Sequence, residues 1–174
     1  MRISTLSLAS LTLLPLLAVA GCGNSRKDAL AFNEALVNAN RKLELPAKEF
    51  LESLPRAITG GPADAAQVKQ LYEKTRQAMQ QVKADMESVH VPSSQSAQAL
   101  YEAHQKYLQG EERLIEKDFA EVVKLLENSK LGAAEKAQKV NEILVRGGTT
   151  EQADLAVLKS AQRNFAQDNH LTLQ

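Results

Sequence analysis

Three polar side chains recur at intervals of seven residues within one stretch of helical pattern. They are His104, Glu111 and Asp118. Seven residues make almost two turns of an α-helix, so these side chains fall within about 40° of one another around the axis. The same sector carries the apolar residues Leu100, Leu108, Ile115 and Val122. Polar groups placed there would be buried and would need partners.

This polar line allows two interpretations. It could bind a proton, a metal or a small ligand inside a helical bundle, although successive members lie roughly 10 Å apart along the axis and cannot chelate one ion together. It could instead lie at the edge of the apolar seam, or fix the register of packed helices as buried polar residues do in coiled coils. We favour the structural role and keep the ligand site as the alternative.

Other patterns for chemistry are weak. Glu87 and His90 have the Glu-x-x-His spacing of di-iron bundles, but such sites need two of these motifs and two further carboxylates. Met79 and Met86 could suggest a haem, yet methionines at helical spacing are typical of a core. The sequence contains neither a Gly-x-Ser-x-Gly elbow nor a phosphate loop. We therefore expect a protein that is not an enzyme and holds neither a metal nor a cofactor.

The single cysteine, Cys22, follows an apolar stretch that begins after Arg2. The stretch has the length of the apolar part of a signal peptide and is short for a membrane span. The cysteine is preceded by Val19, Ala20 and Gly21, an aliphatic residue and two small ones. Residues 1–23 thus resemble the signal peptide and lipobox of bacterial lipoproteins.

The resemblance implies that a peptidase cuts before Cys22, that the thiol carries a diacylglycerol and that the new amino terminus receives a further acyl chain such as palmitate. Two or more chains anchor a protein stably where one does not. Cys22 would then be an anchor and not a nucleophile, because the thioether consumes the thiolate. Gly23, in place of the Asp that commonly retains lipoproteins in the inner membrane, favours the outer membrane in a Gram-negative host. A retained signal anchor across 3–20 is the rival interpretation.

The amino-acid composition indicates one helical domain and gives little support for other classes of protein. The chain has 174 residues, enough for one domain, with 21 basic and 21 acidic side chains. This balance gives no reason to expect a nucleic-acid partner. One cysteine excludes an intramolecular disulfide. Ala, Leu, Glu, Gln and Lys dominate, and all are good helix formers.

Apolar residues at steps of three and four predict helices from about Ser25 onward. We expect a break at Pro46, a turn at 59–62, a second helix over 63–90 and a third over 94–129. Two shorter helices, 133–146 and 150–168, are expected on either side of Gly147 and Gly148, with Thr149 and Gln152 as a capping box.

The predicted fold is all-α: an antiparallel up-down four-helix bundle whose first and last helices are interrupted. Coiled-coil-like helical hairpins that need a partner are the alternative. We divide the chain into a signal peptide (1–21), a lipidated tether (22–25), one helical bundle domain (26–168) and a C-terminal tail (169–174).

The functional prediction is a lipid-anchored helical bundle of the bacterial cell envelope that acts as a non-catalytic interaction or scaffold module. Its expected partners are the membrane, through the anchor, and either an envelope protein or a second copy of itself. The alternative is a bundle that binds a small ligand or a metal through His104, Glu111 and Asp118.

Overall fold

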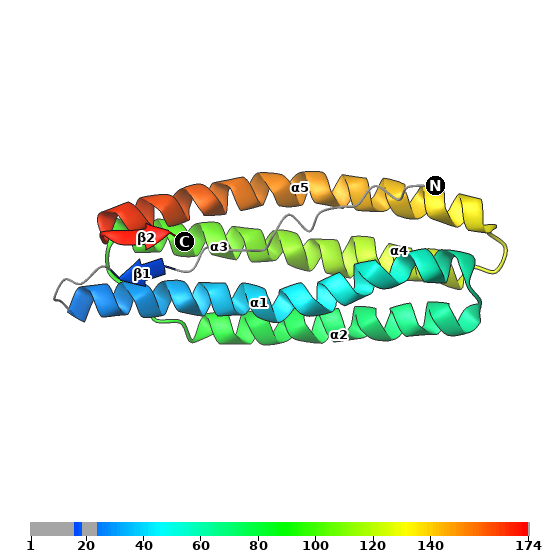
Figure 1. The fold of residues 1–174 in the computed structure, drawn as a ribbon, viewed down its shortest axis with the longest axis horizontal. Coiled ribbons are helices and arrows are strands. Elements are labelled where there is room, and N and C mark those ends of the chain that lie inside the picture. The colour runs from blue at the N-terminus through cyan, green and yellow to red at the C-terminus, as the bar shows by residue number, and fades with distance from the viewer. Residues whose placement is uncertain (1–15, 19–23, 174) are drawn as a thin grey trace.

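The computed structural model describes residues 16–18 and 24–173, which form four long rods joined by short connections. The helices are α1 (Asn24–Thr59), α2 (Pro62–Glu87), α3 (Gln95–Arg113), α4 (Ala120–Glu127) and α5 (Ala133–Asp168). A π-helical segment, Leu114–Phe119, joins α3 to α4, so these three elements make one rod. Successive rods run in opposite directions (Figure 1). The predicted all-α, up-down four-helix bundle is confirmed.

The connections lie where the sequence predicts them, for local reasons. At the α1–α2 turn, a Cβ on Gly60 would lie 2.7 Å from the carbonyl oxygen of Arg56, so only glycine fits. The backbone N–H of Gly61 donates to the carboxylate of Asp64 at 3.3 Å, directly before α2 begins. Ser94 caps α3 by accepting the N–H of Ala97 at 3.2 Å.

The predicted interruptions of the first and last helices are wrong. α1 runs through Pro46 and Pro55, and α5 runs through Gly147 and Gly148. Each proline removes one backbone donor and crowds the carbonyl group four residues earlier, but continuing the helix keeps a long apolar face packed against its neighbours.

The expected capping box at the start of a fifth helix is wrong for the same reason. Thr149 instead donates to the carbonyl oxygen of Val145 at 3.0 Å, a bond inside a continuous helix. No new helix begins at this point of α5.

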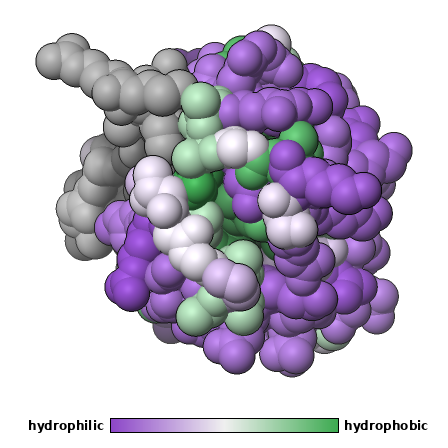
Figure 2. Space-filling model, turned by 90° about the vertical axis from the view of Figure 1, so that its right-hand side faces the viewer, coloured by the Kyte–Doolittle hydropathy of each residue, from purple (hydrophilic) through white to green (hydrophobic). Residues whose placement is uncertain are grey.

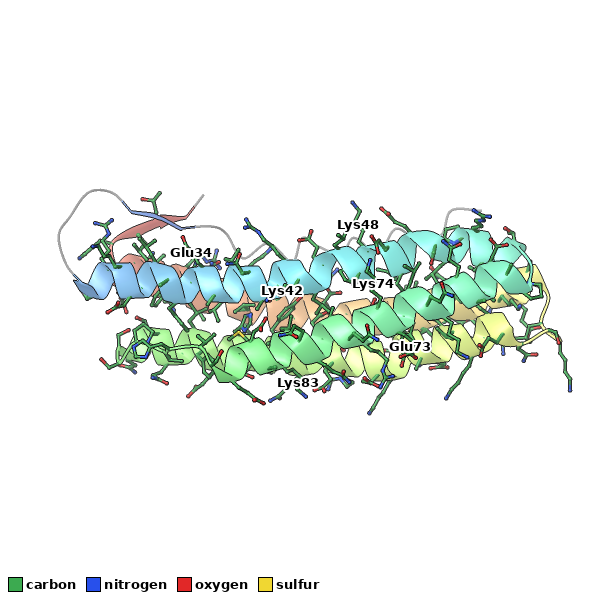
Figure 3. The ribbon with its side chains drawn as sticks, turned by 90° about the horizontal axis from the view of Figure 1, so that it is seen from below. Glu34, Lys42, Lys48, Glu73, Lys74 and Lys83 are labelled. Carbon is green, nitrogen blue, oxygen red and sulfur yellow. The ribbon has the colours of Figure 1, made fainter. Side chains whose placement is uncertain are left out.

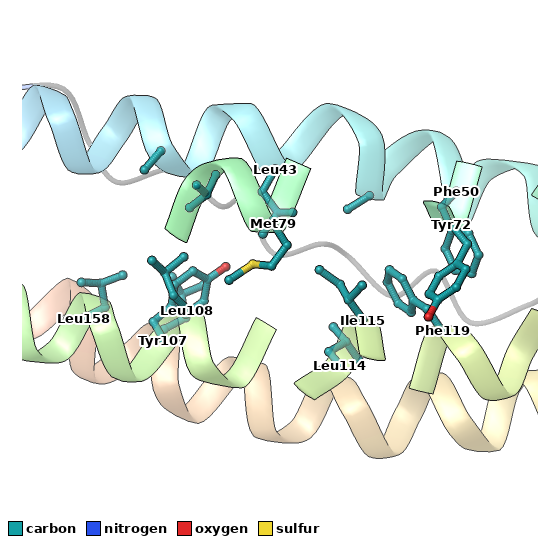
Figure 4. Close-up of a cluster of buried hydrophobic side chains, with 14 of the residues drawn as sticks. Leu43, Phe50, Tyr72, Met79, Tyr107, Leu108, Leu114, Ile115, Phe119 and Leu158 are labelled. Carbon is teal, nitrogen blue, oxygen red and sulfur yellow. The ribbon is translucent and has the colours of Figure 1, made fainter. Parts of the chain in front are cut away.

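The core runs along the axis between the four rods. Phe50 of α1 stacks on Phe119 with ring centroids 4.3 Å apart, and Phe32 meets Phe165 of α5 edge-on at 5.5 Å. Figure 4 shows apolar side chains from different rods converging on this interior, Met79 among them. Because Met79 and Met86 are 3% and 1% exposed, they are core residues.

The outer faces carry charges of both signs. Lys74 pairs with Glu49 at 2.7 Å, and Lys83 pairs with Glu112 at 2.6 Å. Figure 3 shows Lys42 and Lys48 on α1 and Lys74 and Lys83 on α2, all along the middle part of the bundle. Such exposed pairs each contribute about 0–1 kcal/mol, so these faces mainly keep the bundle solvated.

The structure also contains a short strand pair that the sequence analysis did not predict. β1 (Leu16–Ala18) pairs antiparallel with β2 (Leu171–Leu173), with Leu17 opposite Thr172. Three residues are too few to show an alternating pattern. β1 belongs to the predicted signal peptide and β2 to the predicted tail. Next to this pair, Arg26 of α1 donates to the carbonyl oxygen of His170 at 2.7 Å.

Cys22 and its lipobox residues Val19, Ala20 and Gly21 lie outside the described residues. Among the helices that the structure describes, none combines the length and the apolarity needed to cross a membrane.

Candidate functional site

The three members of the predicted polar line have three different environments. His104 is fully buried and Glu111 is 3% exposed, whereas Asp118 is only partly buried. They lie on successive stretches of the third rod, and each faces different partners. The structure therefore does not combine them into one site.

His104 makes a neutral buried contact with α1. Its Nε2 lies 3.0 Å from Oδ1 of Asn40. An amide oxygen only accepts, so Nε2 donates. Burial lowers the pKa of His104 to about 4, against a smaller opposing effect of the Leu36 backbone. A second buried polar pair, Gln162 donating to Asn33 at 2.8 Å, joins α5 to α1. These pairs fix which helix faces meet.

Asp118 belongs to a surface ion-pair group. Arg146 of α5 donates to Asp118 at 2.5 Å and to Glu121 at 3.0 Å. The pairing ties the π-helical segment and α4 to α5 from the outside. Asp118 is therefore a surface partner of Arg146 and is not part of an internal line.

Glu111 belongs to a buried acidic cluster between α3 and α5, which we define as Glu111, Glu151 and Asp154 together with Tyr107. Glu151 and Asp154 are each 9% exposed, and Tyr107 is 1% exposed. Asp154 pairs with the exposed Lys106 at 3.4 Å. Among the described residues, no ion pair joins Glu111 or Glu151 to a basic side chain.

Burial makes Glu111 and Glu151 weaker acids than exposed glutamates. It raises the pKa of Glu111 to about 8, and the nearby charges of Glu151 and Asp154 add to the effect. It also raises the pKa of Glu151 to about 7. The pKa of Tyr107 rises as well, through burial and the neighbouring carboxyls. At neutral pH the cluster therefore holds protons that ordinary carboxyls would release.

Two atoms of the cluster are poorly satisfied. Oε1 of Glu151 is buried without a hydrogen-bond partner among the described residues. The hydroxyl of Tyr107 forms no well-aligned hydrogen bond, although the carboxyl of Glu111 lies close enough to raise the pKa of this hydroxyl. Buried polar groups are rarely left in this state, so the cluster has unused capacity to bind.

Glycines bring the two helices together beside the cluster. A Cβ on Gly147 of α5 would lie 2.4 Å from Cδ1 of Leu114, and one on Gly110 of α3 would lie 2.9 Å from Oδ2 of Asp154. The π-helical segment begins at Leu114, three residues after Glu111. Such segments are frequent at functional sites.

A pocket of about 340 Å³ opens over the cluster between α3, the π-helical segment and α5. Its wall combines the small or apolar residues Gly110, Leu114 and Gly147 with charged side chains of both signs. The charged residues of the wall are Arg113, Lys117, Asp118, Glu121, Arg146 and Glu151. Glu151 is the member of the buried cluster that lines the pocket. The pocket therefore gives solvent a route towards the buried carboxyls.

Sequence reasoning missed Glu151, Asp154 and Tyr107. The signal was present, because the buried residues of α5 recur at steps of three and four through the whole helix. They include Val140, Leu144, Gly147, Glu151, Asp154, Leu158, Gln162 and Phe165. Splitting the helix at Gly147 loses the phase of this stripe and hides that Glu151 and Asp154 face inward.

The described part of the chain contains no group of three or more side chains placed to hold a metal ion. Glu87 and His90, which have the spacing of a di-iron motif, are both exposed. Among the described residues, no further carboxyl or histidine joins Glu87 and His90 in a group that could hold a metal ion.

A second hollow, of about 880 Å³, lies at the end of the bundle that carries the α1–α2 turn and the α4–α5 connection. Seen end-on, apolar residues gather at its centre and polar residues surround them (Figure 2). Ala57, Ala65 and Leu126 contribute to its lining, and Lys69, which pairs with Glu127 at 2.9 Å, stands beside it. We call this end the tip.

Comparison with protein-family models, with curated proteins and with solved structures gave no match to this chain.

Proposed function

We propose that this protein is a lipid-anchored interaction module of the bacterial cell envelope, held by acyl chains on Cys22 and acting by binding. Its partner is an envelope protein or a second copy of the chain. The proposal assigns no catalytic residues, and its functional parts are the anchor and the rigid bundle.

The observation that carries the proposal is the position of α1 relative to Cys22. α1 begins at Asn24, two residues after the cysteine, and continues for 36 residues. At 1.5 Å per residue this helix is about 54 Å long. An anchor at Cys22 would therefore hold the start of α1 against the membrane and the tip about 54 Å along the bundle from it.

The tip has features suited to a partner. Its hollow combines an apolar centre with exposed charges, as interfaces with a buried centre and a polar rim do. The α1–α2 turn there is defined by Gly60 and by an ion pair of 2.6 Å between Arg56 and Asp64. A well-defined turn at the far end supports presentation of a fixed surface.

The experiment combines localisation with cross-linking in intact cells. A photo-reactive residue replaces Gln70, which is exposed and lines the tip hollow, or Glu34, which is exposed on α1 near the other end. We expect a discrete cross-linked product from position 70 and none from position 34. Cys22→Ser should abolish both the membrane retention and the product.

Retention of the Cys22→Ser chain in the membrane would contradict the anchor. Equal cross-linking from both positions, or from neither, would contradict the assignment of the tip as the binding surface.

A further inference from the structure

Within the acidic cluster, Glu111 and Glu151 have no ion-pair partner among the described residues. Asp154, the third carboxyl of the cluster, pairs with the exposed Lys106 of α3. Glu44 of α1 adds a further negative charge near Tyr107. On the open side, Arg146 is paired with Asp118 and Glu121, and the exposed side chains of Arg113 and Lys117 form part of the pocket wall.

The carboxylate of Glu151 is the one acidic group that is buried in the cluster and also lines the pocket. Its Oε1 atom has no partner among the described residues. A carboxylate accepts hydrogen bonds strongly, and the strongest come from charged donors. A charged donor that enters through the pocket would satisfy this unused acceptor.

The dimensions of the site favour an organic cation over a metal ion. Calcium takes six to eight oxygen ligands and structural zinc takes four, whereas the described residues offer no group of three candidate ligands. One ammonium group needs only a few acceptors. The volume of about 340 Å³ lies at the lower end of the range for small-molecule sites. Arg113 and Lys117 in the pocket wall disfavour a second positive charge on the ligand.

We propose that the pocket between α3 and α5 binds a small primary amine in its ammonium form, with the ammonium donating to Glu151, and that binding releases a proton from the acidic cluster to solvent. No covalent bond forms. The proposal goes beyond the interaction function and does not depend on the lipid anchor, because the pocket lies within the bundle itself.

Proton release follows from the state of the cluster before binding. Burial raises the pKa values of Glu111 and Glu151 to about 8 and about 7, so the pair carries protons at neutral pH. An ammonium beside Glu151 favours the ionised carboxylate. Amine binding and proton binding therefore compete, and affinity for the amine rises with pH.

The test is a titration of the isotope-labelled full chain in detergent micelles with ethylammonium chloride, followed by nuclear magnetic resonance. The backbone amides of Gly110 and Gly147 report the pocket wall, and the side-chain carboxyl carbons of Glu111 and Glu151 report their ionisation. A ligand with so few atoms has a dissociation constant of about 1 mM at best. We expect saturable shifts at both glycines, with affinity rising from about pH 6 to about pH 8.

Matched variants make the result specific. Glu151→Gln should weaken binding at least about tenfold, because the amide lacks the charge of a carboxylate. Glu142→Gln removes an exposed carboxyl from the same helix and should bind as the wild type does. Because Gln resembles the protonated acid that the fold already accommodates, both variants are expected to fold, which the spectra themselves check.

Three outcomes would overturn the proposal. The first is the absence of saturable shifts at ethylammonium concentrations well above that dissociation constant. The second is undiminished binding by Glu151→Gln. The third is an equal response to tetramethylammonium chloride, which carries the charge but has no N–H donor.

Discussion

At the residue scale, the buried titratable side chains have the clearest measurable consequences. Glu111 and His104 both lie on α3, where Glu111 is 3% exposed and His104 is fully buried. Burial moves their pKa values in opposite directions, to about 8 and about 4. Both groups are therefore held in their neutral forms near pH 7, and each has a defined effect on stability.

Replacement of Glu111 by Gln should stabilise the bundle at alkaline pH. The folded pKa of Glu111 is about 8 against an ordinary 4.5, so folding takes up a proton between these values. Its contribution to stability is fully present below about pH 4.5 and is lost as the pH rises to about 8. The variant should gain about 2–4 kcal/mol at pH 8 and little at pH 5, measured by urea unfolding.

The matched control is Glu102→Gln, an exposed carboxyl on the same helix, which should leave the unfolding free energy unchanged at both pH values. The contribution of His104 has the opposite sign: it is present above about pH 6.5 and is lost as the pH falls to about 4. Because it acts equally in wild type and variant, the difference between them isolates Glu111. A Glu111→Gln protein that is less stable than wild type at pH 8 would refute the assignment of a buried, protonated carboxyl.

The pair of His104 and Asn40 should behave as a unit. His104→Leu leaves the amide of Asn40 buried without its partner, at an expected loss of about 1–3 kcal/mol. Replacing both residues by Leu removes the unpaired group and should recover much of that loss. A double-mutant cycle by thermal unfolding measures the coupling. Additive effects of the two changes would show that the contact contributes nothing.

At the element scale, the structure differs from the sequence prediction in the continuity of α1 and α5. The turn at 59–62, the end of the third helix near 129 and the fold class could be predicted from glycine, proline and the apolar period. The continuity of α1 and α5 could not, because Pro46 and Gly147 read locally as helix breakers. Packing of one long face overrides such signals. The same local signal concealed Glu151, because its inward position is readable only when the stripe of α5 is followed through Gly147.

Pro46→Ala tests the continuity of α1. In a helix interior, proline lacks a donor and is about 3 kcal/mol less favourable than alanine. Because Pro46 is buried inside α1, lost contacts will offset part of that gain, and we expect a net stabilisation of about 1–2 kcal/mol by thermal unfolding.

Pro62→Ala is the matched control, because Pro62 is the first residue of α2, where proline is well suited. It should be neutral or slightly destabilising. If Pro46→Ala behaved like Pro62→Ala, residue 46 would begin a separate helix and the continuous α1 would be wrong.

At the scale of the whole molecule, the bundle and the anchor are separable. β1 is the one described element that lies within the predicted signal peptide, and it contributes three residues to one strand pair. The core clusters of α1, α2, the third rod and α5 lie outside it. Processing before Cys22 should therefore leave the bundle folded.

A chain that begins at Gly23 tests this independence. Loss of a three-residue strand pair removes few hydrogen bonds, so the unfolding free energy should change by at most about 1–2 kcal/mol. Circular dichroism and thermal unfolding, compared with the full chain in the same detergent, give the answer. Loss of the helical signal in the shortened chain would mean that residues before Cys22 are part of the folded domain.

Lipid anchoring at Cys22 is tested most directly by the intact mass of the protein extracted gently from membranes of its own host. We expect a mass equal to residues 22–174 plus the acyl groups on Cys22. A chain that still carries residues 1–21 and no acyl group would contradict it.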